Sequence, residues 1–281
     1  EKLMGQMSSG NRLTRPSDDP IAHVRISRLQ REEASIAQYK DNIGALSNRM
    51  TQSETVLSSI NSDLLSTRDL LVWALDGGNT GEDLSAMATN LESLRDALYA
   101  SALTKDQEGS YLFSGTLSKT ATVGFNAAAA AGARYTVGGN SEQQQVVVGN
   151  GLTQPANVTL GDEMAAMLNT LDQAIEAIKG GGTTANNPAT RASLQAALTG
   201  VDTGMDQVST KISKLGGAQN IVSTLETNWG NLSTANQTAV LDYSQLNYAT
   251  AAVQLNTLMS AIKATQSAYG KVSQLSLFDA L

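Results

Sequence analysis

Apolar residues recur every seven positions through the first third of the chain, and this repeat predicts one long helix from Glu32 to Ala74. The first row is Ile36, Ile43, Met50, Leu57, Leu64 and Leu71, and the second row, three positions on, is Tyr39, Leu46, Ser53, Ile60, Thr67 and Ala74. As one α-helix this stretch would measure about 65 Å at about 1.5 Å per residue. Because Ser53 and Thr67 interrupt the second row, we expect a bundle within the chain rather than a strict two-stranded coiled coil.

Further segments with helical periodicity precede and follow this helix. They cover residues 1–9, 21–31, 82–107, 162–178, 188–229 and 239–273. The turn cluster Asp76–Asn79 is short, so the helices on either side of it are predicted to form an antiparallel αα-hairpin. Between the last two segments, Gly230–Thr234 is predicted to interrupt the helix.

The connection before the long helix contains a helix-start signal. In Pro16-Ser17-Asp18-Asp19-Pro20, Asp19 is predicted to cap the helix and Pro20 to occupy its first position, where a missing N–H costs nothing. Asp18 and Asp19 could instead be metal ligands or an acid pair, although no histidine or third carboxylate is spaced to join them.

Helical periodicity stops at Glu108, and a glycine-rich, strand-like region follows from about Tyr111 to Leu160. Arg134–Val137, the turn residues Gly138-Gly139-Asn140 and Gln143–Val148 predict a strand, a turn and a strand. The predicted fold class is therefore α+β: an elongated, coiled-coil-like rod of bundled α-helices with a small β-rich inserted domain. We expect helical rod parts at 1–108 and 162–281, an inserted outer domain at 109–161, and both termini at one end of the rod.

The composition excludes several kinds of chemistry. Among 281 residues there is no cysteine, so no disulfide, iron–sulfur cluster or thiolate zinc site can form. The net charge of −7 does not favour binding to nucleic acid or to an anionic membrane. No apolar run is long enough to span a bilayer and no signal peptide is recognisable, although we expect the natural start to lie upstream of Glu1.

Few residues could form a catalytic or cofactor site. His23 is the single histidine and lies in an apolar helix start, where a surface or bundle position is the simpler interpretation. Gly149-Asn150-Gly151 lacks the third glycine of a dinucleotide fingerprint, and no phosphate-binding Gly-Lys-Ser or Gly-Lys-Thr loop is present. We therefore predict no catalytic residue, no cofactor and no metal.

Three segments together resemble the bacterial flagellin superfamily. Met7-Ser8-Ser9-Gly10-Asn11-Arg12 followed by Pro16–Pro20 resembles its N-terminal stretch, in a form closer to the hook-associated proteins than to filament flagellin. Gly109–Gly115 resembles the segment that leads into the outer domain of such proteins, and Leu275-Ser276-Leu277-Phe278 is similar to their C-terminus. The resemblance covers both helical parts and is loose over Ala121–Gly161.

This resemblance implies a structural subunit at the junction between the flagellar hook and the filament. It further implies partners: further copies of the chain in a ring, hook-associated protein 1, flagellin, an export chaperone and the flagellar type III export apparatus. The location implied is extracellular, on the flagellum, with export that needs no cleaved signal peptide. Filament flagellin or another member of the superfamily stays an alternative, as does an enzyme with its site in the β-rich region.

The apolar stripe of the last helix and the tail after it are the predicted assembly surface, together with the side of the first helix. The candidate partner-binding residues are Leu3, Met7, Leu255, Met259, Ile262, Tyr269, Leu275, Leu277 and Phe278. The alternative for the part before Tyr269 is that the stripe packs entirely on the long helix that begins at Glu32. An apolar stripe without an internal partner is typical of a binding face.

Overall fold

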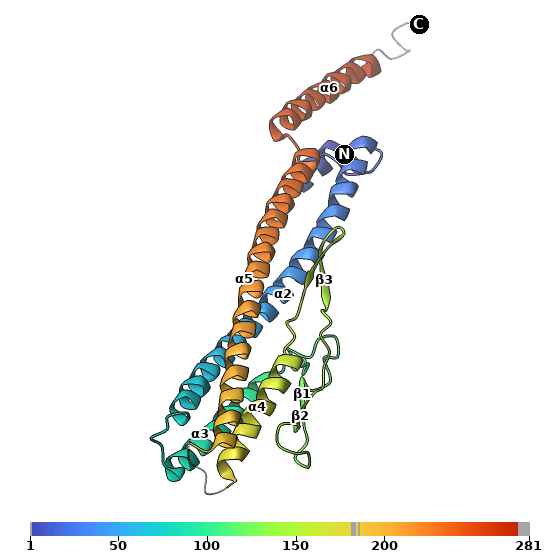
Figure 1. The fold of residues 1–281 in the computed structure, drawn as a ribbon. Coiled ribbons are helices and arrows are strands. Elements are labelled where there is room, and N and C mark those ends of the chain that lie inside the picture. Colours follow the sequence, from blue (N-terminus) through green and yellow to red (C-terminus); the bar gives the residue numbers. More distant parts are fainter. Residues whose placement is uncertain (1, 181–183, 185, 275–281) are drawn as a thin grey trace, which may run out of the picture. The chain divides into compact units, whose positions relative to one another are not determined.

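The computed structural model describes residues 2–180, 184 and 186–274, and these form long α-helices with two pairs of short antiparallel strands (Figure 1). The helices are α1 (Lys2–Ser9), α2 (Pro20–Ala74), α3 (Gly81–Ala102), α4 (Gly161–Lys179), α5 (Pro188–Ser244) and α6 (Tyr248–Gln274). The strands are β1 (Val123–Phe125), β2 (Tyr135–Val137), β3 (Gln145–Gly149) and β4 (Leu152–Pro155). The predicted combination of long helices with a small β portion is confirmed.

The chain divides into two compact units. The terminal unit consists of Glu1–Gln38 and Asn228–Leu281, and the central unit of Tyr39–Thr227. The division falls inside α2 and inside α5, whereas α3, α4 and the strands belong entirely to the central unit. The predicted parts at 1–108, 109–161 and 162–281 are consecutive stretches of the chain, whereas the two compact units are defined by contacts between residues. The units therefore do not test that division, and it remains a prediction.

The heptad seam of α2 is buried as predicted. In the central unit every member of the first row, from Ile43 to Leu71, is at most 2% exposed, and in the terminal unit Ile36 is 1% exposed. The polar residues of the second row are buried with it. The hydroxyl of Thr67 donates to the carbonyl oxygen of Asp63 at 2.7 Å, so its burial leaves no unsatisfied donor.

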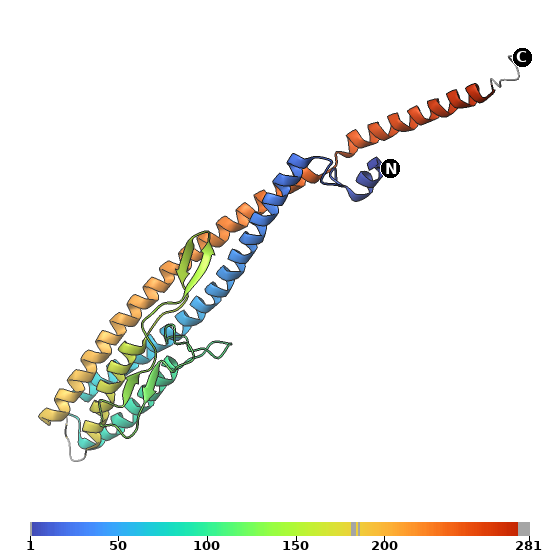
Figure 2. The same cartoon turned by 90° about the vertical axis from the view of Figure 1, so that its right-hand side faces the viewer.

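The core of the central unit is completed by apolar rows of α3, α4 and α5. The views in Figures 1 and 2 agree in placing α3 beside α4. The fully buried side chains on these helices include Leu84, Leu91, Leu98, Leu168, Leu171, Ile175, Leu194 and Val201. Four other large apolar residues of α3 and α5, namely Leu94, Leu198, Met205 and Ile212, are only half-buried.

Small residues take the second seam position of α5. Ala197 and Gly204 are buried, whereas the larger apolar residues one position further on, Leu198 and Met205, are half-buried. A Cβ atom at Gly204 would lie 2.9 Å from the sulfur of Met167 on α4, so a side chain here would require the Met167 side chain to move. This second buried row of α5 is hard to recognise in the sequence, because small residues are easily overlooked in an apolar repeat.

The predicted start of the long helix is confirmed at Pro20. A side-chain oxygen of Asp19 accepts a hydrogen bond from the backbone N–H of Ala22 at 3.0 Å, as an N-cap residue does. A second cap begins α3, where Thr80 and Asp83 form a reciprocal capping box. Each box residue satisfies a backbone N–H that the helix itself leaves free.

The predicted strand pairing is wrong. The segment at 135–137 pairs with β1 rather than with 145–149, and β3 pairs with β4 across the Gly149–Gly151 turn. The Gly138–Asn140 segment does not form a hairpin because it packs against the chain before β1. A Cβ atom at Gly138 would lie 2.2 Å from the carbonyl oxygen of Ala121, and one at Gly139 would lie 2.6 Å from that of Ser114.

The predicted helix break at Gly230–Thr234 is also wrong, because α5 continues to Ser244. Within the terminal unit Ser233 is buried and donates its hydroxyl hydrogen bond to the carboxylate of Glu33 on α2. Thr234 donates to the carbonyl oxygen of Gly230 at 3.0 Å. These polar side chains are satisfied inside a helix, so they need not end it.

A buried ion cluster fixes the irregular chain before β2 to the helices of the central unit. Asp172 on α4 has a fully buried side chain and pairs with Arg95 at 3.1 Å and with Arg134 at 3.2 Å. Arg134 also pairs with Glu176 at 3.1 Å. A buried carboxylate is stable only with such partners, so this cluster ties three chain segments together.

Candidate functional site

The residues that the sequence offered for chemistry have structural roles or lie in solvent. His23 is exposed on α2. Asp18 accepts hydrogen bonds from Thr14 and Arg15 and pairs with Lys2 at 2.7 Å, and Asp19 caps α2. The ammonium of Lys2, followed by the N–H of Arg15, holds the pKa of Asp18 well below its usual value. Among the residues that the structure describes, no group of three or more histidines and carboxylates could hold a metal ion.

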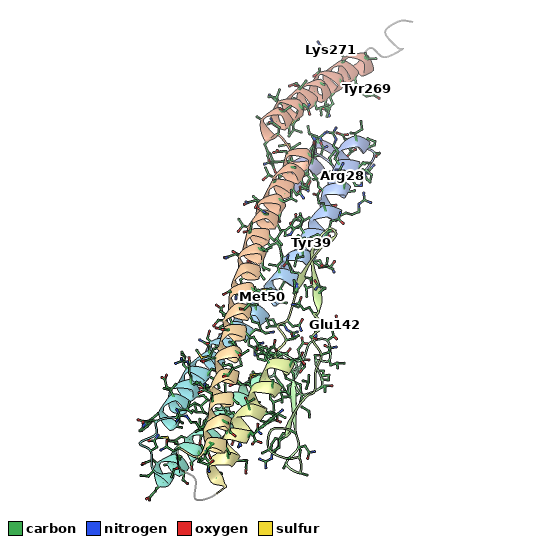
Figure 3. All side chains as sticks on the ribbon, viewed as in Figure 1. Arg28, Tyr39, Met50, Glu142, Tyr269 and Lys271 are labelled. Atoms are coloured by element: carbon green, nitrogen blue, oxygen red, sulfur yellow. The ribbon has the colours of Figure 1, made fainter. Side chains whose placement is uncertain are left out.

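Helix α6 carries the most extensive set of exposed apolar side chains in the terminal unit. From Ala252 to Val272 every residue is exposed except Leu255 and Gly270, which are half-buried. Tyr269 is 76% exposed, and Figure 3 shows its side chain and that of Lys271 directed into solvent. A helix that buries so little of itself leaves its apolar side chains accessible.

The structure places the predicted assembly residues in two groups. Met259, Ile262 and Tyr269 are 50%, 55% and 76% exposed on one face of α6, with Leu255 half-buried beside them. Leu3 and Met7 are half-buried in α1, which packs against α6. Leu275, Leu277 and Phe278 lie outside the described residues.

Sequence reasoning missed some exposed side chains of α6. Leu258 is 52% exposed and lies next to Met259 on the predicted stripe. Val253 is 68% exposed on the opposite face of the helix from Ile262, and Val272, 65% exposed, lies one turn beyond Tyr269. The apolar residues were visible in the sequence, but a periodicity argument selects one stripe and discards the residues outside it.

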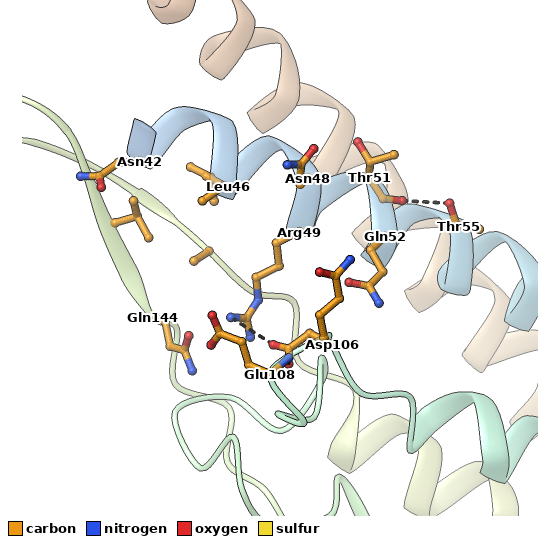
Figure 4. Close-up of a pocket in the computed structure, with 14 residues that line it drawn as sticks. Asn42, Leu46, Asn48, Arg49, Thr51, Gln52, Thr55, Asp106, Glu108 and Gln144 are labelled. Carbon is orange, nitrogen blue, oxygen red and sulfur yellow. Dashed lines mark hydrogen bonds and ion pairs between the residues drawn. The ribbon is translucent and has the colours of Figure 1, made fainter. Parts of the chain in front are cut away.

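A groove of about 860 Å³ lies in the central unit (Figure 4). It lies between α2, the chain after α3 and the β3–β4 pair. Amide side chains dominate its polar lining: Asn42, Asn48, Gln52, Gln107 and Gln144. Asn42 closes one side by donating to the carbonyl oxygen of Val147 at 2.8 Å.

Arg49 is the single cation among the residues described as lining this groove. It forms an ion pair of 3.9 Å with Asp106, and Figure 4 shows Glu108 close to the same guanidinium group. Its Nε and Nη2 atoms are buried without a hydrogen-bond partner in the described chain. Asp106 and Glu108 together carry one more charge than Arg49 neutralises, so the groove offers hydrogen bonding but no free positive charge for an anionic ligand.

The described helices include none that is long and apolar enough to cross a membrane.

Comparison with known proteins supports the resemblance seen in the sequence. The family model of the bacterial flagellin N-terminal helical region matches residues 1–118. Flagellar hook-associated protein 3 of Escherichia coli is 26% identical over 97% of this chain and 90% of that protein. The protein of the same name from Salmonella typhimurium is 34% identical over 52% of this chain and 44% of that protein.

A solved structure extends this agreement to the fold. The structure of a flagellar hook-associated protein from Vibrio parahaemolyticus aligns with a TM-score of 0.73 and 31% sequence identity. The alignment covers 81% of this chain and 100% of that one. Fold and sequence together define a structural subunit of the bacterial flagellum. The chain belongs to the flagellar hook-associated protein 3 family.

Proposed function

We propose that this protein forms the junction between the flagellar hook and the filament and gives flagellin its first attachment surface. The family assignment supports a flagellar role. The observation that carries the proposal is the exposed apolar stripe of α6, since a helix this open is suited to helix–helix assembly with neighbouring subunits. The protein acts as a structural part rather than as an enzyme.

The docking surface consists of the α6 stripe with the adjoining side of α1. On the stripe, Leu258, Met259, Ile262 and Tyr269 are each at least 50% exposed. Their burial in an assembly would contribute about 25 cal/mol for each Å² of apolar area removed from water. Leu3 and Met7 border this surface from α1, and Leu275, Leu277 and Phe278, which were assigned to it from the sequence, lie outside the described residues.

The partners are other axial components of the flagellum. Copies of this chain form a ring that meets hook-associated protein 1 on the hook side and flagellin on the filament side. An export chaperone and the flagellar type III apparatus deliver the chain to the exterior without cleavage of a signal peptide. The exposed stripe agrees with delivery before assembly, because its apolar side chains are covered only in the assembled state.

Substitution on opposite faces of α6 tests this proposal. Met259 and Ile262 are replaced together by serine, with Val253→Ser as the matched control. Val253 is as exposed as they are but lies nine residues before Ile262, which at about 3.6 residues per turn places it on the opposite face. We expect cells with the double substitution to carry hooks without filaments and to release flagellin into the medium.

The control cells should keep their filaments. Circular dichroism of the purified double variant should match that of the unsubstituted protein, so that loss of filaments reports docking and not folding. Normal filaments on cells carrying the double substitution would overturn the assignment of the α6 stripe as the docking surface.

A further inference from the structure

The turn between α5 and α6 is paired with a segment from the other end of the chain. The backbone N–H of Arg12 donates to the carbonyl oxygen of Ser244 at 2.7 Å, and that of Leu246 donates to the carbonyl oxygen of Gly10 at 2.9 Å. These bonds flank an antiparallel bridge between Asn11 and Gln245. Gly10–Arg12 therefore acts as a short strand laid against the turn at 245–247.

The side chain of Arg12 adds two more connections at the same place. One guanidinium nitrogen donates to the carbonyl oxygen of Tyr243 at 3.0 Å, and the other binds the carboxylate of Asp19 at 3.2 Å. Its own carbonyl oxygen accepts a hydrogen bond from Gln6 of α1 at 2.5 Å. Arg12 thus joins the end of α5, the start of α2 and α1.

These contacts meet a requirement of the end of α5. The last carbonyl groups of a helix have no partner within it and carry partial negative charge. Arg12 supplies a donor to two of them, from its backbone to Ser244 and from its guanidinium to Tyr243. The planar guanidinium of Arg12 holds the carbonyl and the carboxylate through two separate nitrogens with fixed donor directions, whereas an ammonium presents its three donors from one nitrogen on a flexible stem.

Helix α6 is held on its other side by α1. The hydroxyl of Tyr248, the first residue of α6, donates to the carbonyl oxygen of Met7 at 3.1 Å. Gly10 passes directly beneath this hydroxyl with φ of 72°, and a Cβ atom there would lie 3.2 Å from it. The left-handed backbone and the close approach both favour glycine at this position.

We propose that Arg12 is a positioning residue that fixes the direction in which α6 leaves α5, and that the carbonyl oxygen of Gly10 supports it by accepting the hydrogen bond from Leu246. Hydrogen bonds from the N-terminal segment reach Tyr243, Ser244 and Leu246, on both sides of the point where α5 ends, so this segment can select one direction for α6. This inference deepens the proposed function, because it makes presentation of the α6 docking stripe depend on a segment more than 230 residues away in sequence.

The absence of cysteine allows a direct distance measurement. Ala235 on α5 and Ser267 on α6 are both exposed, and cysteine at these two positions accepts spin labels without competing sites. Double electron–electron resonance then gives the distribution of distances between the helices. We expect Arg12→Ala to widen this distribution at least twofold, and Arg12→Lys to widen it by an intermediate amount.

Arg15→Ala is the matched control, because Arg15 is exposed on the same connection and the charge change is the same. It should leave the distribution unchanged. If Arg12→Ala also loses helix content, Asp19→Asn provides the test, since asparagine can still cap α2 but cannot hold the guanidinium by charge. An unchanged width for both Arg12→Ala and Asp19→Asn, or equal widening by Arg15→Ala, would overturn the inference.

The positioning role of Arg12 and the assignment of the α6 docking stripe are tested by different measurements. If the stripe is wrongly assigned but Arg12 does position α6, Arg12→Ala widens the distribution of α5–α6 distances, while cells with the Met259 and Ile262 double substitution keep their filaments. If Arg12 does not position α6, the distribution of α5–α6 distances stays narrow in Arg12→Ala, whether or not cells with the double substitution keep their filaments.

Discussion

Replacing Leu57 by alanine tests whether the heptad seam of α2 is the core of the central unit. The Leu57 side chain is completely buried, and its neighbours along the seam, Ser53 and Ile60, are at most 2% exposed. The substitution removes three carbon atoms, worth about 2.4 kcal/mol at about 0.8 kcal/mol each. Since a closed core relaxes incompletely around the resulting cavity, the total cost should be about 2–5 kcal/mol.

The assay is thermal unfolding followed by calorimetry. For a unit of roughly 190 residues, each kcal/mol lowers the Tm by about 2–4 °C, so a loss of about 3 kcal/mol lowers it by about 6–12 °C. Leu65→Ala is the control on the same helix, because Leu65 is 45% exposed and faces away from the seam. Its cost should stay within about 0.5 kcal/mol.

The comparison can fail in two ways. A Tm unchanged by Leu57→Ala would mean that this face of α2 does not form a core. Equal shifts for the two variants would mean that helix propensity, and not burial, determines the response, since both substitutions replace leucine by alanine.

Three further predictions concern buried charge and helix capping. Asp172→Ala should lower the free energy of unfolding by about 3–5 kcal/mol in urea titration, because Arg95 and Arg134 lose their buried partner; an unchanged midpoint would contradict this. Thr80→Ala should cost about 1 kcal/mol and Thr80→Ser much less, and equal losses would argue against the capping box. Hydrogen bonds from Thr80 lower the pKa of Asp83 below its ordinary value of 3.8, so this stabilisation is present above about pH 4 and disappears as the pH falls through the lowered pKa; the unfolding curves of Thr80→Ala and the unsubstituted protein should therefore converge in acid.

Features that depend on neighbouring residues in the sequence were predictable. The repeat from Ile36 to Leu71 marks the buried face of α2, because the helical period brings every seventh residue to the same side. Asp19 and Pro20 mark its start, because the capping bond spans three residues. Both signals are local, so neither needs knowledge of the rest of the fold.

Features that depend on distant partners were not predictable. Gly138 and Gly139 suggest a turn, but contacts with Ser114 and Ala121 determine their conformation. Likewise Gly230 suggests a helix end, although packing of α5 on α2 keeps the helix intact there.

The same difference between features set by neighbouring residues and features set by distant partners applies to the candidate site. Periodicity identified the α6 stripe of Met259, Ile262 and Tyr269, and the structure leaves these residues exposed. The contacts of Arg12 with Tyr243 and Ser244 cross almost the whole chain, and no local pattern indicates them.

Localisation of the protein along the flagellum tests the central claim most directly. Antibody against this protein, detected by gold labelling in electron micrographs of intact flagella, would report its position. A junction subunit should give label confined to a narrow band between hook and filament. Label distributed along the whole filament would instead identify a filament flagellin and contradict the account.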